Sequence, residues 1–218
     1  MREGAVKGWS IVYDYMLERV YDKIWICVSR SPTNMSLKLY IGPMFAGKST
    51  VILGLIRRNT FIGKKTMCVT SSLDSRSGNA IKSHDNDSYP ATTTAELAPM
   101  LKMAEFHSAN TVVIEEAQFF PDLKAFVLTA VEDYRKEVVV VGLDGDSSRK
   151  PFGQILDLIP FCDSVQKLTA LCIRCGDGTP AIFTSRRAGN PDQQVLVGAS
   201  NLYEPLCRMH FATCKDTS

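Results

Sequence analysis

The sequence predicts an α/β protein in which a parallel β-sheet is covered by helices and is followed by a smaller, loop-rich segment. Continuous apolar runs of strand length alternate with helical patterns, as in sheets buried on both faces. A glycine-rich loop separates the first strand from the first helix. From Ala170, Cys, Gly, Thr, Arg and Asn become frequent and long helices end. We therefore expect three parts, at residues 1–36, 37–170 and 171–214.

The composition limits the classes of protein that this chain can be. Its 218 residues, 45% hydrophobic and 22% charged, suit one main domain with a small appendage. The net charge of +2 provides no basic field, so we expect no nucleic-acid partner. No apolar stretch approaches the length of a membrane span. Seven scattered cysteines without a signal peptide favour a reducing compartment, with the cytoplasm as the default.

Apolar periodicity places the elements of the sheet domain. Runs of β-forming residues predict strands at 37–41, 65–70, 111–114 and 137–143. A helix should begin near Lys48, with an apolar face of Ile52, Leu55, Ile56 and Phe61. A polar loop should cover 71–89, and a weak helix 94–106. The clearest helical pattern follows i, i+3, i+4, i+7, i+8 and i+11 spacing, at Leu123, Phe126, Val127, Ala130, Val131 and Tyr134. Residues 1–36 show only a loose amphipathic pattern.

The loop after the first strand spells G-x-x-x-x-G-K-S, the pattern of a phosphate-binding P-loop. Gly42 and Gly47 allow backbone N–H groups to point inward at phosphate oxygens, and the following helix N-terminus adds positive potential. Lys48 would reach the β- and γ-phosphates, and the Ser49 hydroxyl would bind Mg²⁺. An ordinary βα turn does not explain this Lys and Ser. The expected nucleotide loop consists of Gly42, Pro43, Met44, Phe45, Ala46, Gly47, Lys48 and Ser49.

Two acidic residues, Glu115 and Glu116, follow the third predicted strand. Active sites of open α/β sheets lie at the carboxyl ends of strands. In P-loop enzymes an acid at this place helps to hold Mg²⁺, and a neighbouring carboxylate can act as general base. Paired acids also occur as solvated strand ends. The P-loop earlier in the same chain favours the functional interpretation.

Four residues of the C-terminal part have the spacing of a structural zinc site. Cys172 and Cys175 form C-x₂-C, and Cys207 and His210 form C-x₂-H. Cys214 is a rival for the fourth position. A metal bound here would close the long intervening loop and stabilise a segment with few apolar residues.

Five ordered blocks of the sequence point to a family: Gly42–Ser49, Ile114–Phe120, Gly142–Gly153, Lys167–Cys172 and Tyr203–Arg208. Together they closely resemble type II thymidine kinases, the zinc-containing cytosolic enzymes of animals, bacteria and large DNA viruses. The resemblance covers roughly residues 37 to 211. It implies a RecA-like P-loop domain with a zinc-binding lasso domain, and a homotetramer. The implied reaction transfers the γ-phosphoryl group of ATP to the 5′-hydroxyl of thymidine, with Mg²⁺.

The resemblance also implies roles for individual residues. Glu116 matches the carboxylate that takes the 5′-hydroxyl proton, and Arg76 matches an arginine that neutralises charge near the transferred group. With Lys48 these would carry catalysis, although the residues alone favour a surface role for Arg76. The implied ATP contacts beyond the P-loop are Asp74, Arg76, Glu115 and Gln118. The implied nucleoside contacts are Met44, Phe119, Ser147, Phe152, Thr184 and Tyr203, with the lasso backbone of Gln194, Val195, Leu196, Val197 and Gly198.

Three positions depart from the family pattern. Glu115 replaces the usual aspartate, Ser147 replaces an aromatic residue, and residues 176–180 form a glycine-rich insertion after the first cysteine pair. None of them changes Lys48 or Glu116, so we expect an active enzyme.

Two other classes of function stay open at this point. One is a zinc-containing P-loop ATPase that acts on nucleic acid, against which the near-neutral charge argues. The other is a catalytically weak family member that only binds nucleotide, which the changes at Glu115 and Ser147 suggest. ADP release measured with and without thymidine separates the three.

Overall fold

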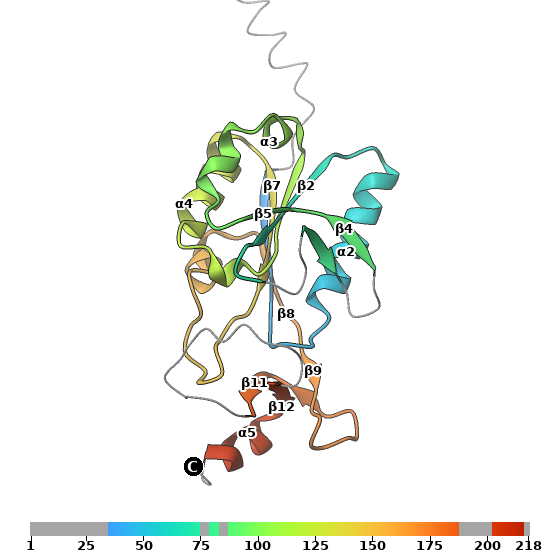
Figure 1. The fold of residues 1–218 in the computed structure, drawn as a ribbon, viewed down its shortest axis with the longest axis vertical. Helices are drawn as coiled ribbons and strands as arrows, with labels where there is room; N and C mark the ends of the chain where they lie inside the picture. The colour runs from blue at the N-terminus through green and yellow to red at the C-terminus, as the bar shows by residue number, and fades with distance from the viewer. Residues whose placement is uncertain (1–34, 75–78, 83–86, 188–201, 216–218) are drawn as a thin grey trace, which may run out of the picture. The chain divides into compact units, whose positions relative to one another are not determined.

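In the computed structural model of this protein, a six-stranded, all-parallel β-sheet organises the described part of the chain (Figure 1). The structure describes residues 35–74, 79–82, 87–187 and 202–215, which all belong to one compact unit. The strands of the sheet are β1 (Ser36–Ile41), β2 (Thr66–Ser71), β5 (Thr92–Thr94), β6 (Thr111–Ile114), β7 (Glu137–Gly142) and β8 (Ser164–Lys167). Their order in the sheet is β5–β2–β6–β7–β1–β8.

The sequence predicted four of these strands and missed two. β1, β2, β6 and β7 begin and end within one residue of the predicted bounds. β8 is exposed along its whole length and β5 consists of three threonines, so neither contains a buried apolar run. The predicted extension lies almost wholly outside the described residues, and the domain boundary near Ala170 stays a prediction.

The sheet is buried on both faces, and the valines of β7 show how. Val138 and Val140 point into one core, whereas Val139 and Val141 point into the other. Successive residues of a strand alternate between faces, so a strand buried on both sides is apolar throughout. Helix α2 (Lys48–Phe61) packs on the second core. The opposite face is covered by α3 (Ala104–Ser108), α4 (Leu123–Leu128) and the turns around them (Figure 1).

Several predicted details differ from the structure. Ile52, Leu55 and Ile56 of α2 are buried as expected, but Phe61, the last residue of the helix, is 91% exposed. The predicted polar loop contains a short hairpin, β3 (Ala80–Lys82) and β4 (Ser88–Pro90). Ile81 of the hairpin packs against α2 in the core of that face, which a single apolar residue among polar ones does not reveal.

The weak helix predicted for 94–106 is broken into two pieces. A 3₁₀ helix, η1 (Ala98–Lys102), precedes α3, and Met103 between them has extended backbone. Pro99 lies in the first turn of η1, where its missing N–H costs nothing. The Asp122 carboxylate accepts hydrogen bonds from the backbone N–H groups of Leu97 and Ala98. The start of η1 is therefore fixed by a residue far away in sequence.

The clearest predicted helix is confirmed, with a change of pitch near its end. α4 continues into a π-helical turn, η3 (Thr129–Asp133), where Tyr134 N–H bonds to the Thr129 carbonyl over 3.2 Å. Two further 3₁₀ helices are η2 (Ala117–Phe119) and η4 (Leu156–Phe161). Among the described helices, none has both the length and the apolar character needed to cross a membrane.

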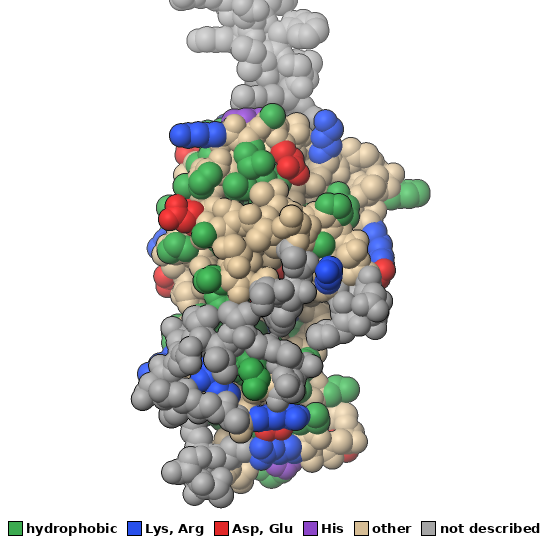
Figure 2. Space-filling view, in the orientation of Figure 1, with side chains coloured by type: hydrophobic (Ala, Val, Ile, Leu, Met, Phe, Trp, Pro, Cys, Tyr) green, Lys and Arg blue, Asp and Glu red, His purple; other side chains and the backbone are tan. Residues whose placement is uncertain are grey.

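The C-terminal lobe is built from short strands and one helix. Its elements are β9 (Ala170–Leu171), β10 (Pro180–Ala181), β11 (Phe183–Arg186), β12 (Tyr203–Leu206) and α5 (Arg208–Lys215). Its small core includes Leu206 and Phe211, and Phe45 and Ala46 of the P-loop pack against that core. In Figure 2 basic side chains flank an acidic one on this lobe, where Arg174 pairs with Glu204 at 2.5 Å.

A buried carboxylate network lies at the amino-terminal ends of the central strands. Glu137 of β7 accepts hydrogen bonds from Lys38 at 2.6 Å, from Thr111 at 2.9 Å and from Lys64. Burial alone would raise the pKa of Glu137, but these bonds outweigh burial and lower the pKa to about 2. The network joins three strands and the turn that follows α2, at the end of the sheet opposite to the P-loop.

The first prediction concerns this network. Because the pKa of Glu137 is lowered from 4.5 to about 2, its contribution to stability is present above 4.5 and is lost as the pH falls toward 2. Glu137→Gln should lower the free energy of unfolding at neutral pH by on the order of 3 kcal/mol. Urea unfolding of both proteins at several pH values measures this. The exposed Glu132→Gln is the control, and a deficit that does not shrink in acid contradicts the prediction.

Candidate active site and metal centre

The P-loop lies between the carboxyl end of β1 and the first turn of α2, as the sequence predicts. Gly42 has φ +152°, and a Cβ placed on it would lie 2.4 Å from the Leu168 carbonyl oxygen. Gly47 has φ +72° and open space around the Cβ position. Lys48 Nζ donates hydrogen bonds to the carbonyls of Pro43, at 2.8 Å, and Gly42. The ammonium group is thus held over the loop.

A carboxylate and a hydroxyl meet beside the P-loop. Ser49 Oγ donates a 2.5 Å hydrogen bond to Glu115 Oε1 at the end of β6. Glu115 is 4% exposed, and within the described residues its Oε2 has no hydrogen-bond partner. Burial raises its pKa to about 7, and the negative charges of Glu116 and Asp74 add to the effect, although the bond from Ser49 opposes it. A divalent cation at this place would satisfy the buried oxygen, so the two residues fit a Mg²⁺ site.

Glu116 has an unusual backbone for its residue type. Its φ of 50° and ψ of 41° are left-handed, a region in which side chains other than glycine are uncommon. Gln118 Nε2 donates a 2.5 Å hydrogen bond to Glu116 Oε2. Backbone strain of this kind gathers at functional sites. The strained residue is Glu116, and it directly follows Glu115 after the end of β6.

The structure brings some of the expected nucleoside residues together. Met44 N–H donates a 2.9 Å hydrogen bond to Thr184 Oγ1, which joins the P-loop to β11. The rings of Phe119 and Phe152 meet edge to face with centroids 5.5 Å apart. Ser147 is half-buried in the loop that follows β7. Arg76 and the residues 194–198 lie outside the described residues, so their expected roles stay predictions.

An apolar cavity of about 570 Å³ adjoins the P-loop and the C-terminal lobe. Tyr203, an expected nucleoside contact, shares its wall with Gly176 and Gly178 of the insertion. The other lining residues are Phe45, Leu171, Cys172, Ile173, Arg187 and Pro205. Sequence reasoning did not find this cavity, because its walls come from four separate segments.

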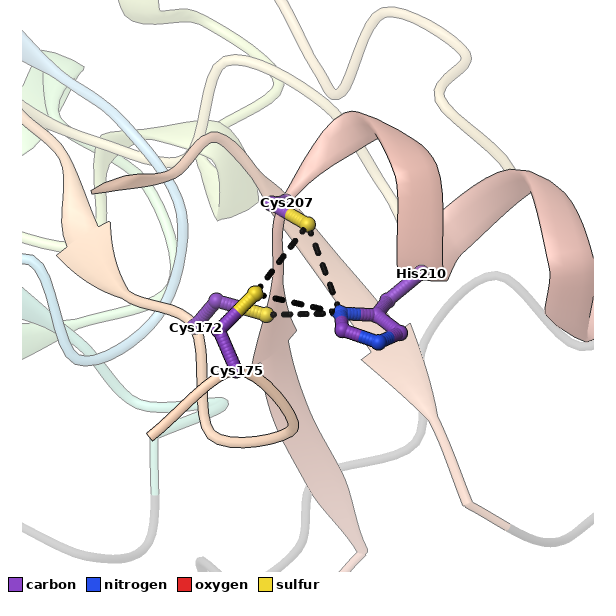
Figure 3. Close-up of side chains that lie close together, drawn as sticks. All are labelled: Cys172, Cys175, Cys207 and His210. Atoms are coloured by element: carbon purple, nitrogen blue, oxygen red, sulfur yellow. Dashed lines mark hydrogen bonds between the residues drawn. The ribbon is translucent and has the colours of Figure 1, made fainter. Parts of the chain in front are cut away.

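Three cysteines and one histidine converge in the C-terminal lobe (Figure 3). The candidate ligand atoms of Cys172, Cys175, Cys207 and His210 all lie within 4.8 Å of one another. His210 Nδ1 is 3.4, 3.3 and 3.5 Å from the sulfurs of Cys172, Cys175 and Cys207. Ligands of a tetrahedral zinc ion lie roughly 3.5 Å apart, given bonds of about 2.0 to 2.3 Å. The group could therefore hold a metal ion, as the sequence predicts.

The cluster is positioned by one turn and by the start of one helix. Cys172 and Cys175 lie on the turn after β9, while Cys207 and His210 lie at the start of α5. Burial would raise the pKa of Cys172, but hydrogen bonds from the backbone N–H groups of Cys207 and Cys175 and from His210 lower it to about 6. Burial and the neighbouring cysteines instead raise the pKa of Cys175 to about 11. A thiolate is the form that binds metal, so Cys172 is the readiest ligand before an ion is present. The side chain of Cys214, the rival ligand, lies outside the described residues.

The parallel sheet and the loop between β1 and α2 define an α/β protein of the P-loop class. The family model for thymidine kinase matches residues 35–211, so the chain belongs to the thymidine kinase family. Thymidine kinase a of Arabidopsis thaliana is 37% identical over 183 residues, covering 82% of this chain and 75% of the relative. The thymidine kinase of Oryza sativa subsp. japonica is 37% identical over 80% of this chain and 65% of its own length. That of Myxoma virus (strain Uriarra) is 37% identical over 79% and 93%.

The second prediction compares how alanine substitutions at the two P-loop glycines affect the stability of the unliganded protein. Gly42→Ala forces a Cβ against a backbone carbonyl, whereas Gly47→Ala meets open space and costs only its left-handed backbone. We expect the second to destabilise the fold by about 1–2 kcal/mol and the first by clearly more. Thermal unfolding without nucleotide measures both. Equal losses in the two variants would contradict the contact with Leu168.

Proposed function

We propose that this chain is a thymidine kinase that transfers the γ-phosphoryl group of ATP to the 5′-hydroxyl of thymidine. The observation that supports it most is the pairing of Ser49 with Glu115 beside the P-loop, in a chain of the thymidine kinase family. Phosphoryl transfer needs positioning and charge stabilisation more than covalent chemistry. The residues at this edge of the sheet offer a group for each need.

The phosphate end of the site would be formed by the P-loop. Its backbone N–H groups would bind the triphosphate, and Lys48 would exchange the carbonyls of Pro43 and Gly42 for phosphate oxygens. Ser49 and Glu115 would hold Mg²⁺, which when bound neutralises charge on the phosphates. Glu115 is one methylene longer than the aspartate usual in the family, and its carboxylate still lies within hydrogen-bond distance of Ser49. The replacement of aspartate by Glu115 is therefore no argument for a weak enzyme.

Glu116 would accept the proton of the 5′-hydroxyl as general base. Arg76 would neutralise charge near the transferred group. On the nucleoside side, Thr184 and Tyr203 would contact the substrate together with the backbone of residues 194–198. The ring pair of Phe119 and Phe152 would form the wall beside Ser147, with Met44 completing the pocket.

We further propose that the Cys₃His cluster holds a structural Zn²⁺. Three soft sulfurs and one imidazole are the donor set that favours tetrahedral zinc over Mg²⁺ or Ca²⁺. The ion would fix the turn after β9 to the start of α5. A homotetramer in the cytoplasm is our proposal on the family resemblance alone.

The third prediction tests the kinase reaction. ADP release should require thymidine, and Glu116→Gln should lower kcat about 10²–10⁴-fold while ATP binding persists, because an amide cannot accept the proton. Coupled-assay kinetics and calorimetry with ATP measure the two quantities. ADP release that is equal without thymidine would refute the proposed function, and a Gln variant with wild-type turnover would assign the base elsewhere.

The fourth prediction tests the metal. Purified protein should contain one zinc per chain, and His210→Ala should lose it while Cys214→Ala keeps it. A structural zinc site contributes on the order of 10 kcal/mol of apparent binding energy, so its loss should unfold the C-terminal lobe first. Elemental analysis and limited proteolysis report the two effects. The reverse pattern of zinc retention would make Cys214 the ligand.

A further inference from the structure

The side chain of Gln118 connects Glu116, at the end of β6, to the residue that follows β7. Gln118 lies in η2 and is only 4% exposed. Its Nε2 donates to Glu116 Oε2 at 2.5 Å, while its Oε1 accepts a 3.0 Å hydrogen bond from the backbone N–H of Leu143, directly after β7. One buried amide therefore ties the end of β6 to the end of β7.

Two glycines make room for this residue. A Cβ on Gly142 would lie 2.3 Å from Gln118 Oε1 and 2.6 Å from Ile155 Cδ1. A Cβ on Gly153, whose φ is +60°, would lie 2.2 Å from the backbone oxygen of Gln118. These glycines are the two ends of segment 142–153, which carries the expected nucleoside contacts Ser147 and Phe152. Both ends of this segment thus close on Gln118.

We propose that Gln118 is a positioning residue for phosphoryl transfer, which holds the Glu116 carboxylate in its reacting orientation and fixes it relative to segment 142–153. The proposal rests on the proposed role of Glu116 as general base. A hydrogen bond to a charged acceptor is short and directional, so it selects one orientation of a partly exposed carboxylate. Displacement of a reacting group by about 1 Å can cost roughly 100-fold in rate.

This role differs from the ATP contact that the family resemblance implies for Gln118. Both hydrogen bonds described for the amide are made within the protein, one to Glu116 and one from the backbone N–H of Leu143. A residue that acts on Glu116 should affect turnover, whereas an ATP ligand should affect ATP affinity. The two roles therefore separate in kinetics.

The fifth prediction uses two substitutions that divide the functions of the amide. Gln118→Glu keeps an acceptor for Leu143 N–H but removes the donor to Glu116 and places a like charge beside it. Gln118→Met keeps the volume and removes both bonds. We expect both variants to lose about 10–100-fold in kcat with little change in the KM for ATP, because each removes the hydrogen bond that orients the Glu116 carboxylate.

Gln154→Met is the matched control. Gln154 has the same bridging chemistry, since its amide donates to the Pro121 carbonyl at 2.6 Å and accepts from Lys124 N–H at 2.9 Å, but it does not contact Glu116. It should retain wild-type kcat. Thermal unfolding of all variants identifies any general loss of structure.

Three results would overturn the inference. The first is a near-wild-type Gln118→Glu beside a defective Gln118→Met, which would mean that the amide only supports segment 142–153 through Leu143. The second is a rise in the KM for ATP at unchanged kcat, which would make Gln118 an ATP ligand. The third is a Gln154→Met variant that loses as much kcat as the Gln118 variants, which would attribute the effect to lost packing.

A double mutant separates this inference from the proposed function. If Gln118 acts only through Glu116, then Gln118→Met should cause no further loss in a Glu116→Gln background. A Glu116→Gln enzyme with full activity would refute the proposed base itself. An inactive Glu116→Gln enzyme, combined with wild-type turnover of both Gln118 variants, would refute only the positioning role.

Discussion

The hydrogen bond between Ser49 and Glu115 is the contact on which the site depends, because it joins the first turn of α2 to the end of β6. The strand that precedes the P-loop, β1, is separated from β6 in the sheet by β7, so the bond joins parts of the site that follow strands which are not neighbours. A carboxylate that is almost fully buried and has one unsatisfied oxygen is costly on its own. The cation proposed for this place would satisfy that oxygen and so would relieve a local free-energy cost of the unliganded fold.

Much of the fold could be predicted because it is encoded locally. The valines at 138–141 and the glycines at 42 and 47 each report a burial or a backbone conformation that few alternatives satisfy. The strands that were missed have no such local sequence signal. β8 is exposed at all four residues and is identified by its backbone pairing with β1. The start of η1 depends on the distant carboxylate of Asp122.

The same distinction applies to the site. The spacing of Cys172, Cys175, Cys207 and His210 identifies a ligand set because short turns leave few ways to arrange them, and the structure does bring the four together. The hydrogen bonds of Gln118 could not be predicted. They depend on the neighbouring positions of β6 and β7 in the sheet and on the absence of a side chain at Gly142. Pairings between strand ends are a property of the topology.

The packing of Phe45 and Ala46 in the core of the C-terminal lobe makes the phosphate loop a shared wall between two substructures. The lobe therefore cannot be treated as a detachable module. A deletion or domain exchange that removes it would strip an apolar surface from the loop itself, so chimaeras within this family should be joined outside both segments. For the same reason, oxidation of the cysteine cluster, or removal of the zinc ion proposed there, would disturb the P-loop from a distance.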